Sequence, residues 1–123
     1  MTLRNDRRGL GRRGEALAAE HLAQRGCTIL DRNWRTTGGE IDLVIQDGET
    51  LAFVEVRTRR GRALGTPEES ITPAKQARLI ELAQAYVQAV DWAGPWRIDV
   101  VAIEMDRRGR LLRVDHYENA VTG

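Results

Sequence analysis

The residues best suited to chemistry lie on two apolar stretches that flank the dipeptide Asp47-Gly48. This dipeptide is a strong signal for a type I′ hairpin, because both of its residues tolerate a positive φ. We therefore expect a hairpin in which Asp42 faces Phe53. Because side chains alternate along a strand, this register brings four charged side chains to one face of the sheet, namely Glu40, Asp42, Glu55 and Arg57.

In this register Asp42 and Glu55 are diagonal neighbours, with Cα atoms roughly 7–8 Å apart. Two carboxylates at this spacing can close around one cation. The surrounding residues are apolar on both faces, which is typical of a sheet that is covered on both sides. Isolated carboxylates in such a setting are costly, so they need either arginine partners or a divalent metal ion. The hairpin alone leaves both interpretations open.

Two predicted helices can add polar side chains to the same region. A helix is expected over residues 11–25, and Glu15 lies three residues before Ala18 on its apolar stripe. Glu15 can therefore point inward to a site, or it can simply complement the positive end of the helix dipole. A second helix is expected from Pro73 to Val90, with Thr72 as its N-cap residue.

Lys75, the sole lysine of the chain, lies at the start of this second helix, four residues before Leu79 on its apolar face. One interpretation is a catalytic or phosphate-contacting ammonium group. The other is a side chain whose stem packs on the core while its amine reaches water.

The remaining pattern predicts one α/β domain over residues 1–123, with a mixed sheet flanked by helices. A first strand is expected over residues 27–36, and together with the two strands of the hairpin it should form a three-stranded antiparallel meander. Two more strands are expected over residues 96–103 and 111–117. Residues 58–72 are expected to form a surface loop. Residues 1–10 are expected to form a basic N-terminal arm that need not be ordered.

Composition excludes several classes of protein. Apolar residues make up 41% and charged residues 30% of the chain, which indicates a globular protein without membrane association. The single cysteine, Cys27, excludes an internal disulfide and favours a reducing compartment, so we expect a cytoplasmic location. One cysteine and two histidines do not supply a zinc site of the usual kind.

The net charge is only +1, but the arginines are clustered near the N-terminus and after the hairpin. Such clusters are typical of contacts to a phosphate backbone, although each can also be a solvated surface. The expected nucleic-acid contacts are Arg12, Arg13, Arg59, Arg60 and Arg62.

Six successive motifs resemble those of the YraN-like family, an uncharacterised bacterial family placed in the PD-(D/E)xK nuclease superfamily. The motifs are GRRGEALA, GGEIDLV, FVEVRTR, TPAKQARL, WRIDVVAI and HYENAV, and they extend from about Gly11 to Val121. The resemblance implies a restriction-endonuclease-like fold related to that of Holliday-junction resolvases. It also implies a metal centre for Mg²⁺ or Mn²⁺ formed by Asp42, Glu55, the Val56 carbonyl and Glu15.

Arg57 stands where the superfamily usually has lysine. Arginine can clamp a phosphate, but it stays charged and cannot act as a general base. Lys75 can supply the missing ammonium from the second helix. Asp42, Glu55 and Glu15 complete the expected catalytic set.

Together these expectations describe a metal-dependent endonuclease that acts on structured or branched nucleic acid, DNA in preference to RNA. The alternative is a catalytically inactive nucleic-acid-binding module of the same fold. A scaffold for a protein partner is a third alternative without a positive signal in the sequence. A homodimer is expected only by analogy with resolvases.

Overall fold

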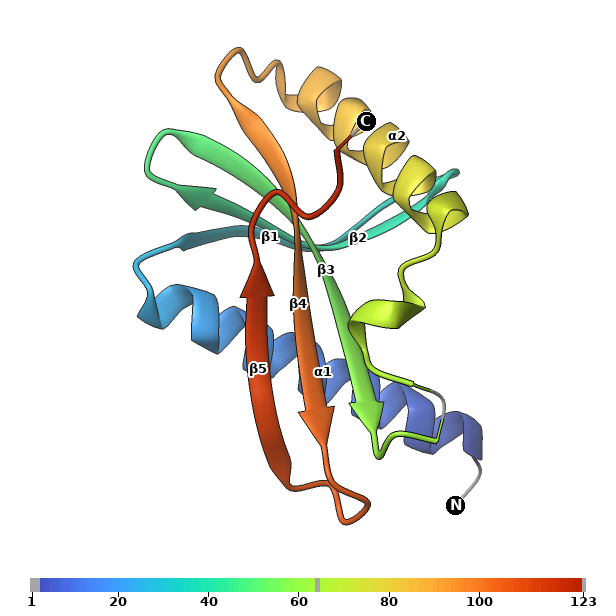
Figure 1. Ribbon diagram of the computed structural model, residues 1–123. Coiled ribbons are helices and arrows are strands. Elements are labelled where there is room, and N and C mark those ends of the chain that lie inside the picture. The colour runs from blue at the N-terminus through green and yellow to red at the C-terminus, as the bar shows by residue number, and fades with distance from the viewer. Residues whose placement is uncertain (1–2, 64, 123) are drawn as a thin grey trace.

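In the computed structural model, which describes residues 3–63 and 65–122, two helices cover opposite faces of one five-stranded sheet (Figure 1). The elements are α1 (Leu3–Gln24), β1 (Thr28–Thr36), β2 (Gly39–Asp47), β3 (Thr50–Arg60), the 3₁₀ helix η1 (Glu68–Ser70), α2 (Pro73–Val90), β4 (Trp96–Met105) and β5 (Leu111–Tyr117). The strands lie in sequence order, and only β3 and β4, which α2 connects, are parallel. This mixed α/β architecture is compatible with a restriction-endonuclease-like fold.

The core has two layers because the strands are apolar on both faces. On one face, α1 packs Ala18 and Leu22 against the sheet. On the other face, α2 packs Leu79, Leu82 and Tyr86. No helix in the described part of the chain is long and apolar enough to span a membrane.

The bounds of α2 agree with the sequence prediction because its end signals are local. Thr72 Oγ1 accepts a hydrogen bond from the Lys75 backbone N–H at 3.2 Å, and Pro73 occupies the first turn. Asp91 ends the helix in the left-handed region, with a φ of 55°.

The α1 helix begins at Leu3 rather than at Gly11, so residues 3–10 of the expected arm extend this helix. Met1 and Thr2 lie outside the described residues. The longer helix runs through three glycines, and Gly14 is buried against β3. A methyl group at position 14 would lie 1.9 Å from Thr58 Oγ1. Glycine therefore allows α1 to approach β3 closely beside Glu15.

The predicted hairpin register is wrong by two residues. Asp47 pairs with Thr50 and Leu43 pairs with Val54, so Gly48 and Glu49 form the turn. Gly48 has a φ of 61° at the first central position, which is the requirement of a type II′ turn. This turn needs a positive φ only at glycine and spares Asp47. An even shift preserves the faces of the paired residues, so Glu55 stays on the face of Phe53, where Lys75 of α2 contacts it.

The segment predicted as a loop is more structured than expected. β3 continues to Arg60, and η1 lies in the second half of the segment. Glu68 accepts hydrogen bonds from Arg113 Nη2 at 2.8 Å and from the Tyr117 hydroxyl at 2.9 Å. These contacts fasten the connection between β3 and α2 to β5.

Candidate metal centre

Asp42 lies where β2 separates from β3. The β2–β3 ladder ends at the Leu43–Val54 pair, and beyond it the Val56 backbone N–H donates to Asp42 Oδ2 at 2.8 Å. Ile41 packs on the α2 side of the sheet and Leu43 on the α1 side, so the alternation of side chains is interrupted at Asp42. The aspartate carboxylate thus takes the place of a backbone partner and is held at the opening between the strands.

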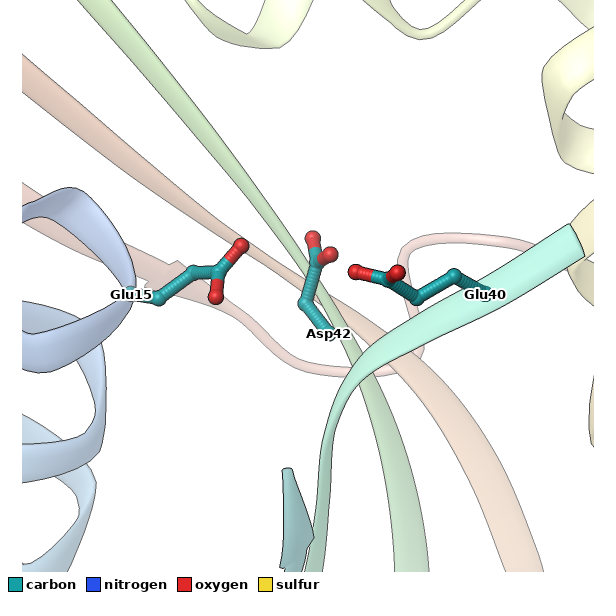
Figure 2. A group of neighbouring side chains, drawn as sticks. All are labelled: Glu15, Glu40 and Asp42. Carbon is teal, nitrogen blue, oxygen red and sulfur yellow. The ribbon is translucent and has the colours of Figure 1, made fainter. Parts of the chain in front are cut away.

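Three carboxylates meet at this opening. Figure 2 shows Glu15 reaching from α1 and Glu40 from β2 toward Asp42, which lies between them. One oxygen of each side chain lies within 4.8 Å of the other two, and all three residues are partly buried. Oxygen ligands from carboxylates are the type that Mg²⁺ and Mn²⁺ prefer. The cluster can therefore hold a metal ion, and it includes Glu40, which was not among the predicted ligands.

Glu55 lies beside this cluster and is already paired with two cations. Its side chain is 5% exposed, and its Oε2 lies 3.1 Å from Arg57 Nη2 and 3.3 Å from Lys75 Nζ. The acidic hairpin therefore combines the two arrangements that the sequence left open, which are pairing with basic side chains and a candidate metal site. Glu55 has the basic partners, whereas Asp42 has a backbone donor.

The charge balance at Asp42 favours a cation. Burial raises the pKa of its carboxyl group to about 8, and the negative charge of Glu55 adds to this effect. The Val56 N–H acts in the opposite direction, and Glu15 again raises the pKa. The protein alone does not compensate a second negative charge here, so a divalent cation would favour the ionised form.

The site opens into a cleft with a volume of about 820 Å³. All five predicted catalytic side chains line it, together with Glu40, Val56, Arg59 and Arg60. The predicted set is Glu15, Asp42, Glu55, Arg57 and Lys75. The fold therefore gathers acids from α1, β2 and β3 with a lysine from α2.

Two arginines that line the cleft have side-chain donors that are not used in hydrogen bonds to the described residues. The Nε atoms of Arg57 and Arg59 are buried and have no hydrogen-bond partner among the described residues. Arg60 is exposed, and its guanidinium and that of Arg13 both approach Gly109. A buried donor without a partner is costly. The side chains of Arg57 and Arg59 both line the cleft, where their guanidinium groups can contact an anion.

The other expected phosphate contacts, Arg12, Arg13 and Arg62, do not line this cleft. Arg62 is paired with Glu104, with its Nε 2.6 Å from Glu104 Oε2. Arg13 Nη1 donates to the Gly109 carbonyl at 2.6 Å, and Arg12 is exposed on α1. Arg13 and Arg62, which the sequence predicted to contact nucleic acid, are therefore already bound to partners distant in the sequence.

Asn33 is a site residue that the sequence prediction missed. Its side-chain amide donates to Glu15 Oε1 at 2.9 Å and to Glu40 Oε1 at 3.0 Å. The other oxygen of Glu40 lies 2.8 Å from Arg35 Nε. The only sequence signal was an asparagine inside a strand, where this residue type is uncommon.

Three further polar or aromatic side chains have partners away from the acidic cluster. Asp99 is fully buried and pairs with Arg97 Nε at 2.9 Å. His116 Nε2 lies 2.8 Å from the same carboxylate. Trp34 packs edge-on against Tyr86, with ring centroids 5.1 Å apart.

Comparison with known proteins gives one consistent match. The model of the uncharacterised protein family UPF0102 matches residues 14–103, which include every residue of the acidic cluster. A UPF0102 protein of Roseiflexus castenholzii is 50% identical over 123 residues, covering 98% of each chain. One of Pelotomaculum thermopropionicum is 48% identical, covering 93% of this chain and 96% of the relative. One of Clavibacter michiganensis is 51% identical, covering 82% and 86%.

Proposed function

The chain belongs to the uncharacterised protein family UPF0102. From the geometry of its site, we propose that it is a metal-dependent nuclease acting on structured or branched nucleic acid. The observation that carries the proposal is the convergence of four carboxylates with Arg57 and Lys75 in one cleft. The resemblance of the motifs to the PD-(D/E)xK superfamily supports it. The single cysteine favours the cytoplasm as the location.

The acids fit a hard divalent cation. Asp42, Glu15 and Glu40 would hold Mg²⁺ or Mn²⁺, with Glu55 and the Val56 carbonyl as further oxygen ligands. When bound, the ion would supply Lewis-acid chemistry at a phosphodiester. The Val56 N–H would keep the Asp42 carboxylate oriented toward the cleft during this chemistry.

The cations around Glu55 would bind the phosphate. Arg57 Nη2 and Lys75 Nζ both lie within 3.3 Å of one Glu55 oxygen, and both side chains line the cleft, where they can contact a bound phosphate. Arg57 stays charged and can only offset negative charge on the phosphate. Lys75 is the sole lysine of the chain and lines the cleft, and it is therefore the candidate for the role of the missing motif lysine.

Two further arginines of β3 add positive charge to the cleft beside Arg57. Arg59 and Arg60 both line the cleft. A strand of nucleic acid has a phosphate at each nucleotide, so a row of guanidinium groups can hold it across the metal centre. We favour DNA over RNA as the substrate.

An inactive binding module is the second candidate, and two observations favour it. Glu55 is occupied by two cations, and the motif lysine is replaced by Arg57. In such a module the same cleft would bind phosphates through its arginines but would not cut.

The test is incubation of the purified protein with Mn²⁺ and branched, flapped and linear DNA, with RNA substrates in parallel. Metal-dependent cleavage that Asp42→Ala abolishes supports the nuclease. The matched control is Glu49→Ala, because Glu49 is an exposed acid at the hairpin turn. Cleavage that survives Asp42→Ala at an undiminished rate refutes the assignment. Salt-sensitive DNA binding without cutting supports the binding module.

A further inference from the structure

We propose that Asn33 is a positioning residue of the metal centre, whose amide sets the spacing between the Glu15 and Glu40 carboxylates. The inference rests on the proposed metal centre and deepens it. Asn33 would not touch the substrate or the reacting atoms.

The contacts of the amide link two elements that carry negative charge. Asn33 Nδ2 has two N–H groups, and the structure uses them for Glu15 Oε1 on α1 and Glu40 Oε1 on β2. Two carboxylates this close repel each other, and a shared donor between them offsets the repulsion. Each carboxylate keeps its second oxygen for another partner, and for Glu40 one such partner is Arg35.

The backbone at Asn33 is adapted to this arrangement. In the β1–β2 ladder, Arg32 pairs with Leu43 and Trp34 pairs with Ile41, and the intervening Asn33–Asp42 position is left unpaired within this described ladder. Asn33 has a φ of 53°, which non-glycine residues rarely adopt inside a strand. The ladder is therefore interrupted at the level of Asp42, and the strained residue is the one that donates to both neighbouring acids.

A metal ion requires its ligands to be in place before it binds. Partners that hold ligating carboxylates typically change metal affinity by about 10–100-fold when they are lost. Glu15 comes from a helix and Glu40 from a strand, so their separation depends on whatever joins α1 to β1 and β2. The Asn33 amide is the direct polar link between them that the structure shows.

The experiment compares Asn33→Gly with Asn119→Gly. Glycine accepts a positive φ, so Asn33→Gly removes the amide without straining the backbone. Asn119 is the matched control because it has a φ of 51° and does not line the cleft. The Mn²⁺ dissociation constant is measured by calorimetric titration, together with the melting temperature of the metal-free protein. We expect Asn33→Gly to raise the dissociation constant about 10–100-fold. The melting temperature shows whether the metal-free variant is still folded. Asn119→Gly should leave the dissociation constant unchanged.

The outcomes separate this inference from the proposed function. If the wild-type protein binds Mn²⁺ and Asn33→Gly binds it equally well, the positioning role is refuted and the metal centre stands. If the wild-type protein binds Mn²⁺ with the expected loss in Asn33→Gly but cuts no nucleic acid, the positioning role stands and the nuclease is refuted. If the wild-type protein binds no Mn²⁺, both are refuted. If cleavage occurs, excess Mn²⁺ should restore it in Asn33→Gly, because the defect lies in metal binding rather than in the chemical step.

Discussion

The position of Glu15 depends on the close approach of α1 to β3 at Gly14, and replacement of this glycine tests that dependence. In Gly14→Ala the new Cβ would lie 1.9 Å from Thr58 Oγ1, 3.1 Å from Thr58 Cβ and 3.3 Å from Thr58 Cγ2. Ordinary contact begins at 3.4 Å, so the first of these distances must lengthen by about 1.5 Å. Rotation of the Thr58 side chain can move the hydroxyl but not Cβ, so the helix itself must also shift.

The expected free energies have opposite signs at two glycines of the same helix. Alanine is normally favoured over glycine inside a helix by about 1 kcal/mol. In Gly11→Ala the new Cβ would have no atom of the described residues within 4 Å, so this variant should show the gain. Overpacking at Gly14 costs about 1–3 kcal/mol, which cancels or exceeds the same gain. The difference between the two variants in the free energy of unfolding should therefore be about 1–3 kcal/mol.

Urea unfolding of Gly11→Ala, Gly14→Ala, Thr58→Ala and the double variant of the last two measures this difference. Thr58→Ala removes the two outer atoms of the clash, so it should recover most of the loss in the double-mutant cycle. Calorimetric titration with Mn²⁺ should show weaker binding for Gly14→Ala, since Glu15 is the next residue. A Gly14→Ala protein that is stabilised as much as Gly11→Ala would refute the close approach.

Three further predictions concern the charged groups of the site. The pKa of Asp42 is about 8 in the folded protein and near the ordinary value of 3.8 in the unfolded chain. In EDTA, the free energy of unfolding should therefore fall as the pH rises from about 4 to about 8. Urea titrations should show a smaller fall for Asp42→Asn, and an equal fall in both proteins would contradict the assignment. Glu15→Gln should weaken Mn²⁺ binding at least about tenfold in calorimetry, whereas Glu20→Gln, an exposed acid on the same helix, should not. Lys75→Gln should slow cleavage by roughly 10²–10³-fold, because it removes a cation that offsets charge on the phosphate. It should not weaken Mn²⁺ binding, because Glu55 loses a competing cation, and a parallel loss of cleavage and metal binding would exclude a role of Lys75 at the phosphate.

The sequence predicted the features of the fold that depend on local signals. The bounds of α2 follow from Thr72 and Pro73, and the order of the strands follows from apolar runs separated by turns. The hairpin register could not be predicted as reliably, because Gly48 suits either central position of a two-residue turn and the twist of the strands decides between them. The start of α1 was missed because its early glycines do not favour a helix.

The site was predictable in part for a similar reason. Periodicity places Glu15 and Lys75 on the inward faces of their helices, and an even register error does not change the face of Glu55. Partners far apart in the sequence give no such signal. The pairing of Arg62 with Glu104 and the bridging amide of Asn33 depend on how α1, β1 and β4 pack together.

A crystal of the wild-type protein soaked in Mn²⁺ and measured at the manganese absorption edge tests the metal centre most directly. We predict one anomalous peak within coordination distance of Asp42 and at least one oxygen of Glu15, Glu40 or Glu55. A soaked crystal in which Asp42 contacts no manganese, while Arg57 and Lys75 remain on Glu55, would contradict the proposed centre.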